Sequence, residues 1–393
     1  MHFNTLLQPE VQDFIREKTG ENVSKLAFLK NPFPSIEYAA ILNQIECRTK
    51  CQKKLTTWFD SHNIIFPQKI SIEQTSSETT ARYKSELVSG NTLIDLTGGF
   101  GVDDYYFSKV MKQVIHCEIN EELSQIVAHN FKSLEVENVA CIYGDSHETL
   151  KNLNQQFDWI YIDPSRRNDA KGKVFLLADC LPNVPDSLDF YFEFTSSILI
   201  KTAPILDISA GLSELKNVKE IHVVAVDNEV KELLWILSKT ITDSIKIKTV
   251  NLTKTGDEQF EFSLDSESKT AYHLPQKFLY EPNSAIMKSG GFGLVCNQFE
   301  VSKLHQHSHL YTSDELIEFP GRIFEIKLCL EYSKNVIKEQ IEKTTANVTI
   351  RNFPETVDVI RRKWKILDGG LNYYFFTTDI NNRKIVLLCA KIK

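Results

Sequence analysis

The residues with the clearest chemical meaning form a glycine-rich turn that directly follows a short apolar run. The residues of this segment that we expect to bind a ligand are Asp95, Thr97, Gly98, Gly99, Gly101 and Asp103. Glycines allow the backbone to bend sharply and to approach a ligand without steric conflict from Cβ atoms. A carboxylate beside such a turn suits a cationic, amino-acid-bearing ligand better than a phosphate. A tight strand–helix turn without a ligand is the structural alternative.

Three more polar positions follow apolar runs later in the chain. Glu118 lies 23 residues after Asp95, where a carboxylate can accept hydrogen bonds from both hydroxyls of a ribose. Asp145 follows the third run, where an adenine amino group could bind, and Asp163 with Pro164 follows the fourth. The structural alternatives are a solvated strand-end glutamate for Glu118 and a helix N-cap for Asp145. Four such features in this order favour a shared ligand crevice.

The elements that must position these residues are predicted from alternating apolar and amphipathic segments. From about residue 85 the apolar runs are TLIDL, QVIHCEI, ACIYGD, FDWIYID, SILIKTAP and EIHVVAV. Repeated β-α units of this kind form a parallel, doubly wound sheet, with ligands at the carboxyl ends of its strands. We expect Asn228–Lys239 to be the helix after the sixth strand, and the two runs around Gly256 to form a closing antiparallel pair.

Two other regions flank this α/β segment. The first is predicted to be helical, with one helix beginning near Pro9, a second over Ser35–Asp60, and a Ser/Thr-rich link over Gln74–Thr80. The last region is rich in strands and glycine turns and predicts an α+β fold. The predicted organisation is therefore a helical N-terminal region (1–80), a Rossmann-like α/β domain (81–265) and an α+β, ferredoxin-like region (266–393).

Composition restricts the class of protein. The 393 residues are 42% hydrophobic and 25% charged, which is typical of globular domains. Charges interrupt every long apolar stretch and the amino terminus has no signal pattern, so we expect neither a membrane partner nor secretion. Eight cysteines without a CxxC pattern predict reduced thiols and a cytoplasmic location. Cys47 and Cys51 share a helix face and are expected to be packing residues.

Charge is segregated along the chain. The whole chain has a net charge of −7, whereas residues 343–393 contain ten Lys/Arg and four acids. The basic cluster predicted to contact RNA phosphates consists of Arg361, Arg362, Lys363 and Lys365. A solvated basic face of an amphipathic helix is the alternative, and Tyr373–Phe376 predict a buried strand. His305, His307 and His309 are predicted on one face of a strand, and with no acidic or cysteine cluster beside them we expect no metal.

The positions at the strand ends resemble those of class I S-adenosylmethionine (SAM)-dependent methyltransferases. A closer similarity is to the bacterial methyltransferases with a THUMP-like C-terminal domain. The segments that carry it are SIEQTSSETTARYK (71–84), DLTGGFGVD (95–103), YIDPSRR (161–167), DNEVKELL (227–234), YEPNSAIMKSGGF (280–292), HLYTS (309–313), FPGRIF (319–324), RNFP (351–354) and DGG (368–370).

This resemblance implies a function for each strand-end group. SAM would bind to the turn after Asp95, with Glu118 at its ribose and Asp145 on its adenine side. Asp163 would orient the methyl acceptor and help to accept its proton, with Pro164 in the same substrate-side segment. A THUMP-like region implies RNA-binding, and hence modification of a structured RNA such as transfer or ribosomal RNA.

The methylated atom is less well defined by the residues. Aminomethyltransferases commonly place Pro and an aromatic residue after the Asp-Pro pair, whereas this chain has Ser165 and Arg166. Carbon-5 pyrimidine methyltransferases need a cysteine after the next strand, where this chain has Lys201-Thr-Ala-Pro. We therefore favour nitrogen methylation.

Arg166 and Arg167 have two interpretations. They could bind an RNA phosphate, or they could form ion pairs at the end of the sheet. For the whole chain, the rival functions are a protein or small-molecule methyltransferase and a catalytically silent RNA-binding protein.

Overall fold

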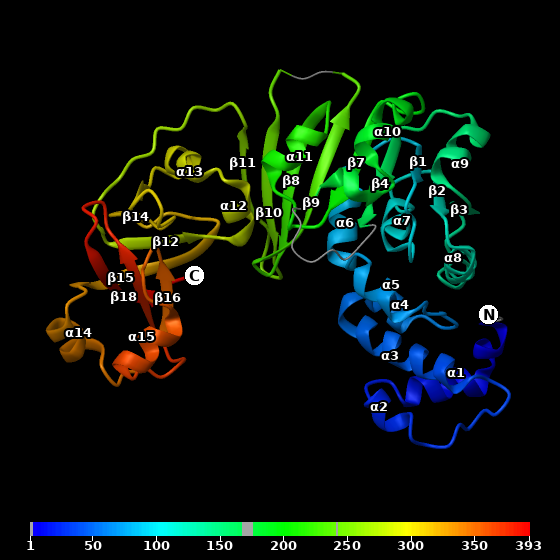
Figure 1. Cartoon of the computed structure of the whole chain (residues 1–393), viewed down its shortest axis with the longest axis horizontal. Helices are drawn as coiled ribbons and strands as arrows, with labels where there is room; N and C mark the ends of the chain where they lie inside the picture. Colours follow the sequence, from blue (N-terminus) through cyan, green and yellow to red (C-terminus); the bar gives the residue numbers. More distant parts are fainter. Residues whose placement is uncertain (1–2, 167–175, 241–242) are drawn as a thin grey trace. The chain divides into compact units, whose positions relative to one another are not determined.

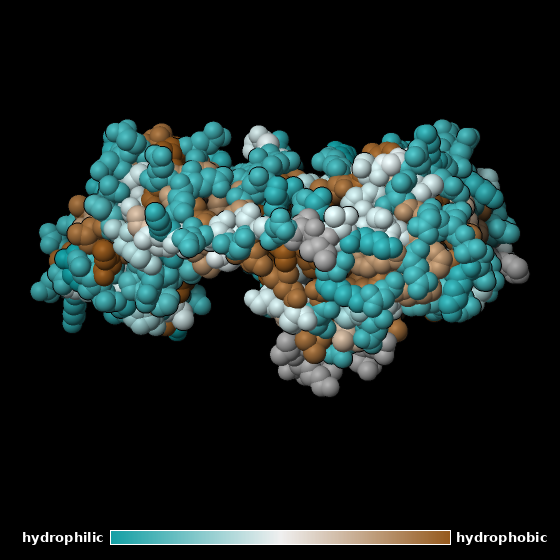
Figure 2. Space-filling view, turned by 90° about the horizontal axis from the view of Figure 1, so that it is seen from above, coloured by the Kyte–Doolittle hydropathy of each residue, from teal (hydrophilic) through white to brown (hydrophobic). Residues whose placement is uncertain are grey.

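A computed structural model describes residues 3–166, 176–240 and 243–393 of the chain (Figure 1). The chain divides into two compact units. The first unit consists of Met1–Lys219 and Leu233–Thr242, and the second of Glu220–Glu232 and Asp243–Lys393. Within the described ranges, no helix combines the length and the apolar character that crossing a membrane requires. The face in Figure 2 is mostly hydrophilic, with separate hydrophobic patches.

The first unit begins with short helices. They are η1 (Phe3–Leu7), α1 (Pro9–Glu17), α2 (Val23–Leu26), α3 (Tyr38–Lys54), α4 (Thr56–Asp60), α5 (Lys69–Gln74) and α6 (Glu78–Glu86). Their apolar side chains share a core with the segment after the glycine-rich turn, since Trp58 and Phe66 both pack against Phe100. Cys47 and Cys51 are buried in this core, as predicted.

Two expectations for these helices need correction. The segment Ser35–Asp60 contains two helices, α3 and α4, because the backbone leaves helical geometry at Leu55. Only part of the Ser/Thr-rich segment is a link, since Ser77 accepts a hydrogen bond from the amide of Thr80 and is the N-cap of α6. Side-chain caps of this type define where a helix begins.

Parallel strands and helices alternate in the rest of the first unit, as predicted. The parallel strands are β1 (Thr92–Asp95), β2 (Gln113–Glu118), β3 (Val139–Tyr143), β4 (Trp159–Ile162) and β7 (Ser197–Thr202). The helices are α7 (Val102–Phe107), α8 (Glu121–Ser133), α9 (Ser146–Leu153), α10 (Val184–Tyr191) and α11 (Ile208–Glu214). The strand order is β7-β4-β1-β2-β3, with β1 in the centre. Near the end of β4, β5 (Ser165–Arg166) pairs with β6 (Cys180–Leu181), which follows η2 (Leu177–Asp179).

The helix predicted over Asn228–Lys239 is wrong. These residues form β9 (Glu229–Ser238), whose second half pairs antiparallel with β7. Residues 232–237 are all buried, so both faces of the segment are covered, which suits a central strand better than a helix with one apolar face. Trp235 donates a hydrogen bond to Thr202 and occupies space that a side chain at Gly211 would fill.

The second unit contains β8 (Val218–Val226), β10 (Lys246–Leu252) and β11 (Glu258–Ser263), and β10 and β11 are the predicted antiparallel pair. A seven-stranded sheet follows, in the order β13-β14-β12-β15-β18-β17-β16. Its strands are β12 (Phe278–Pro282), β13 (Ser302–Lys303), β14 (Tyr311–Ser313), β15 (Gly321–Glu331), β16 (Asn347–Arg351), β17 (Asn372–Thr378) and β18 (Lys384–Lys391). The helices of this unit are α12 (Ser284–Ser289), α13 (Phe292–Phe299), α14 (Lys334–Ile341) and α15 (Val357–Trp364). This arrangement confirms the predicted α+β fold.

The three histidines of this unit do not lie on a strand. His305, His307 and His309 belong to the turn between β13 and β14, and His309 has a positive φ of 50°. The alternation of histidines had suggested a strand, whereas the turn is closed by the backbone amide of Ser308 bonding to His305. In the part of the chain that the structure describes, no group of three or more His, Cys, Asp or Glu side chains could hold a metal ion.

A buried ion pair attaches α6 to α7. Lys84 is fully buried, and its Nζ lies 3.2 Å from Asp103 Oδ1 and donates to Ser76 Oγ at 3.1 Å. The other oxygen of Asp103 accepts hydrogen bonds from Ser76 Oγ at 2.8 Å and from Tyr161 Oη at 2.9 Å. Because α7 begins at the end of the glycine-rich turn, this network holds the turn against both α6 and β4.

We expect Lys84→Met to destabilise the fold, because it leaves the buried charge of Asp103 without its partner. Breaking a buried pair in this way commonly costs about 3–5 kcal/mol. Urea unfolding of the variant measures the lost free energy of unfolding. Lys112→Met, which replaces an exposed lysine of the same unit, is the matched control. Adding Asp103→Asn should restore part of the stability. Equal unfolding midpoints for Lys84→Met and Lys112→Met would contradict the prediction.

A second buried pair lies behind the glycine-rich turn. Asp104 Oδ2 and His116 Nδ1 are 2.7 Å apart, and both side chains are fully buried. Burial raises the pKa of Asp104 well above its ordinary value of 3.8 and lowers the pKa of His116 below 6.5. Burial also raises the pKa of the neighbouring Asp95. The folded protein therefore favours the uncharged forms of all three groups.

These shifts predict a pH dependence of stability that Asp104→Asn should change. Above pH 3.8 the unfolded chain loses the Asp104 proton while the folded protein retains it, so this group destabilises the fold as pH rises. His116 acts in the opposite sense below pH 6.5, where only the unfolded chain gains its proton. Asp104→Asn should therefore gain stability relative to wild type between pH 5 and pH 8. Unfolding free energies that differ by a constant across this range would refute the assignment.

Candidate active site

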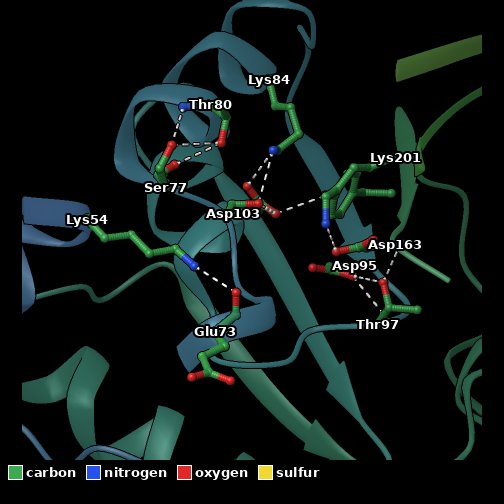
Figure 3. Close-up of polar contacts among 12 residues, drawn as sticks. Lys54, Glu73, Ser77, Thr80, Lys84, Asp95, Thr97, Asp103, Asp163 and Lys201 are labelled. Carbon is green, nitrogen blue, oxygen red and sulfur yellow. Dashed lines mark hydrogen bonds and ion pairs between the residues drawn. The ribbon is translucent and has the colours of Figure 1, made fainter. Parts of the chain in front are cut away.

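Thr97 joins the carboxyl ends of β1 and β4. Asp95 Oδ1 accepts hydrogen bonds from the amide of Thr97 at 2.7 Å and from its hydroxyl at 3.0 Å. The same hydroxyl accepts a hydrogen bond from the amide of Asp163 at 2.7 Å. Asp95 and Asp163, the first and the last acid of the predicted crevice, are therefore connected through Thr97 (Figure 3).

The three glycines of the turn have different roles. A Cβ at Gly98 would lie 2.2 Å from the ring of His116, and a Cβ at Gly101 would lie 2.8 Å from the rings and methyls of α8. Packing therefore requires glycine at these two positions. At Gly99, which has a φ of +55°, the nearest atom to an added Cβ is a backbone oxygen 3.7 Å away. The space beside Gly99 is thus the open side of the turn, where a ligand can approach the backbone.

Glu118 lies at the end of β2 and contacts the turn directly. Its Oε2 accepts a hydrogen bond from the amide of Gly99 at 2.9 Å, and its Oε1 accepts one from the amide of Asn120 at 2.7 Å. These two bonds set the direction of the carboxylate. Because Glu118 and Gly99 are joined in this way, a ligand beside Gly99 would also lie beside Glu118.

Asp145 is the N-cap of α9. Its Oδ1 accepts hydrogen bonds from the amides of His147 and Glu148 at 2.9 and 3.2 Å. The helix N-cap, given above as the structural alternative for this residue, is therefore confirmed. Both bonds use the same oxygen, and the residue is exposed at the end of β3. Ile119 and Tyr143, which follow β2 and end β3, are 71% and 58% exposed. Apolar surface therefore lies beside the two acids, as a planar base would require.

Asp163 forms an ion pair with Lys201, a residue whose role sequence reasoning missed. Lys201 Nζ donates to Asp163 Oδ2 at 2.5 Å, and the two side chains are 14% and 30% exposed. Lys201 lies in β7, next to β4 in the sheet. From the sequence alone, this position indicated only the lack of a cysteine. A charged residue near the carboxyl end of the next parallel strand was the available signal. Pro164, beside Asp163, is buried.

The amino-terminal helices bring a further lysine to this site. Lys54, at the end of α3, donates to the carbonyls of Ile72 at 2.9 Å and Glu73 at 3.1 Å. Burial and, to a smaller degree, the neighbouring charge of Lys201 lower the pKa of Lys54. Figure 3 shows Lys54 to the left of Asp103, and Asp163 with Lys201 to its right.

Asp103 is also a predicted ligand residue, but it is buried, and side chains of the protein contact its carboxylate. Both of its oxygens face Lys84, Ser76 and Tyr161. Of the two arginines after Ser165, Arg166 ends β5, and Arg167 lies outside the described residues. Cys180 is buried, and its backbone pairs with Arg166 in a short strand.

The basic C-terminal cluster belongs to the second unit. Arg361 is paired with Asp368, and Lys363 Nζ lies 3.0 Å from Glu355. Arg362 and Lys365 are exposed, and Trp364 anchors the helix in a core. The segment Tyr373–Phe376 is part of β17 and largely buried, as predicted.

Comparisons with known proteins agree with this description. Residues 278–320 match a ferredoxin-like domain family, and residues 321–391 match a family described as THUMP domain-like. No curated protein matches the chain. A crystal structure of a candidate methyltransferase from Porphyromonas gingivalis W83 is 31% identical, with a TM-score of 0.89 and 99% of each chain covered.

Two more distant structures each match 42% of this chain. One is a candidate methyltransferase from Streptococcus mutans in complex with SAH, at 15% identity and a TM-score of 0.31, covering 42% of this chain and 97% of that one. The other is the tRNA m1G37 methyltransferase of M. jannaschii, at 13% identity and a TM-score of 0.29, covering 42% and 49%. The assignment rests on the full-length match alone. The chain belongs to the family of bacterial class I SAM-dependent methyltransferases with a THUMP-like C-terminal domain.

Proposed function

We propose that this chain transfers a methyl group from SAM to a nitrogen of a nucleotide in structured RNA, such as transfer or ribosomal RNA. The observation that carries the proposal is the hydrogen-bonded connection of three strand ends, in which Gly99 bonds to Glu118 and Thr97 bonds to Asp163. The glycine-rich turn and the Asp163 carboxylate are thus joined through Thr97, which supports a cofactor and a methyl acceptor bound next to each other. The THUMP domain-like match over residues 321–391 supports RNA as the substrate class.

The residues around Gly99 fit the parts of SAM. The open backbone at Gly99 suits the amino-acid group, with Asp95 supporting the turn through Thr97, and Glu118 suits the ribose hydroxyls. Ile119 and Tyr143 offer exposed apolar surface for the adenine, and Asp145 can accept a bond from its amino group through Oδ2. We assign Gly98, Gly101 and Asp103 an indirect role, because their contacts shape the turn. When bound, SAM supplies a methyl group on a positively charged sulfur.

Asp163 and Lys201 suit the acceptor side. Lys201 fixes the orientation of the Asp163 carboxylate through Oδ2, so Oδ1 can accept a hydrogen bond from the amino group of a nucleotide. When bound, SAM would supply its methyl group to the acceptor nitrogen, and Asp163 would accept the proton that this nitrogen loses and pass it to water. Catalysis of this kind depends mainly on positioning. Pro164 keeps the following backbone at the crevice edge.

Nitrogen methylation is favoured over carbon-5 methylation because the latter needs an accessible thiolate. Cys180 is the cysteine nearest in sequence to the Asp163 segment, and it is buried with its Sγ directed at the carbonyl of Leu176. Burial of a thiol disfavours the thiolate. We further propose that Arg166 and Arg167, and in the second unit Arg362 and Lys365, contact RNA phosphates.

Changing Asp163 should abolish transfer and spare cofactor binding. Asp163→Ala removes the positioned acceptor of the proton, which typically costs about two to four orders of magnitude in rate. Rates are measured with radiolabelled SAM, and SAM affinity by calorimetry, with Asp189→Ala as a control that removes an exposed acid from the same unit. Unchanged turnover of Asp163→Ala would remove this residue from the mechanism.

The substrate class is tested by incubating the full chain with labelled SAM and separate pools of transfer RNA, ribosomal RNA and protein. We expect label in an RNA pool, and nucleoside mass spectrometry should identify an N-methylated base. Label confined to protein would support the rival assignment to a protein methyltransferase. SAM binding without label in any pool would support a silent RNA-binding protein.

A further inference from the structure

A buried glutamate in the second unit binds two arginines from strands that are far apart in the sequence. Glu281, on β12, is 4% exposed. Its Oε2 accepts a hydrogen bond from Arg322 Nε at 2.6 Å, and its Oε1 accepts one from Arg351 Nη2 at 2.6 Å. Arg322 lies on β15 and Arg351 ends β16. Neither the predicted function nor the basic cluster on α15 includes these residues.

The curvature of the sheet brings these residues together. In the strand order β12 neighbours β15, whereas β16 is the opposite edge strand. Leu279, two residues before Glu281, packs with Phe375 of β17 and Ile385 of β18. Strand β12 therefore faces the β16–β17 edge across a shared core, and Glu281 can reach Arg351. Figure 1 shows β12, β15 and β16 in one part of this unit.

The backbone at this point is also closely packed. Gly321 has a φ of +148°, and a Cβ there would lie 2.2 Å from the carbonyl oxygen of Glu281. Only glycine lets β15 approach β12 at this distance. The close approach fixes Arg322, one residue later, directly opposite Glu281 in the strand register.

A further cation lies near Arg351. Burial, and after it the charges of Lys303, His307 and Arg351, lower the pKa of His309 to about 4. His305, in the same turn, lies 3.0 Å from the side-chain amide of Asn352, which follows Arg351. Lys303 Nζ is within 3.4 Å of His309. Lys303 of β13 and Arg351 of β16 are thus both close enough to His309 to affect its pKa.

The arginines remain accessible even though the glutamate is buried. Their side chains are 36% and 38% exposed, compared with 4% for that of Glu281. One carboxylate shared by two guanidinium groups leaves one positive charge, and each guanidinium has five N–H donors. Among the described atoms, Arg351 Nε is buried without a hydrogen-bond partner. Because both arginine side chains are partly exposed, N–H groups that Glu281 does not use can donate to a further anion.

We propose that Arg322 and Arg351 form a binding site for a phosphate of the RNA backbone, with Glu281 as the residue that orients them. This inference rests on the proposed function, in which RNA is the substrate. Guanidinium groups match phosphate oxygens in geometry and stay charged at all physiological pH values. A buried ion pair is not by itself an efficient source of stability, which favours a role in orienting the two side chains. The cluster on α15 is less suited to binding a phosphate in a fixed geometry. Arg361 and Lys363 pair with Asp368 and Glu355, which are both more exposed than Glu281.

The test uses the full chain and unfractionated bacterial transfer RNA as the probe. Affinities are measured at several salt concentrations for wild type, Arg322→Gln and Arg351→Gln. Each variant should bind several-fold more weakly, and each should lower the log–log salt slope by about 0.7–0.9 because one phosphate contact is lost. Lys327→Gln removes an exposed charge from the same strand as Arg322 and should leave the slope unchanged.

A second set of variants separates binding from folding. Arg351→Lys keeps the charge and the pairing with Glu281 but loses the planar fork, so its affinity should lie between wild type and Arg351→Gln. Glu281→Gln should leave both charges but lose their orientation, so its salt slope should be maintained while its affinity falls. Melting temperatures are recorded for every variant.

Equal affinities and parallel salt slopes for wild type, Arg322→Gln and Arg351→Gln would overturn the site. A lowered melting temperature with an unchanged slope would also overturn it and assign the arginines a structural role. Wild-type protein that binds SAM but neither transfer RNA nor ribosomal RNA would refute the proposed RNA substrate, and this inference with it. Failure of the site alone would leave wild-type RNA binding and methyl transfer intact.

Discussion

The ion pair between Lys84 and Asp103 is the constraint on which the geometry of the first unit depends. A lysine without solvent exposure needs a partner, because an isolated buried charge is strongly unfavourable. Asp103 lies in the first turn of α7, directly after the glycine-rich turn, so this requirement fixes α6 against the turn. Ser76 and Tyr161 bind the same carboxylate and extend the constraint to the α5–α6 segment and to β4. The amino-terminal helices thereby help to hold the glycine-rich turn in place.

From this fixed turn, hydrogen bonds extend to the neighbouring strand ends. Gly99 bonds to Glu118 of β2, and Thr97 bonds to Asp163 after β4. Lys201 of β7 then orients Asp163. The carboxyl ends of four adjacent strands thus carry one connected set of polar groups, which is the arrangement that ligand binding in α/β proteins uses. The second unit offers a parallel case, in which a buried Glu281 orients two half-exposed arginines.

Sequence reasoning could predict the features that depend on local patterns. Apolar runs followed by polar residues identified the parallel strands, and the position of each acid after its run correctly placed Asp95, Glu118 and Asp163 at the ends of strands. It failed where long-range contacts decide the outcome. The segment Asn228–Lys239 is a strand because β7 pairs with it, and Lys84, Lys201 and Glu281 gain their roles from residues 19 to 70 positions away. No local spacing distinguishes a lysine that will be buried from one that remains in solvent.

The most direct test of the cofactor site is calorimetric titration of SAM into the full chain and into Glu118→Gln. The substitution keeps the size of the side chain and one acceptor oxygen for Gly99, but it removes the charge that we place at the ribose hydroxyls. Hydrogen bonds to charged groups contribute about 1.5–3 kcal/mol, so the affinity for SAM should fall about 10- to 100-fold. Equal SAM affinity for wild type and Glu118→Gln, or wild-type protein that binds NADH but not SAM, would contradict the site described here.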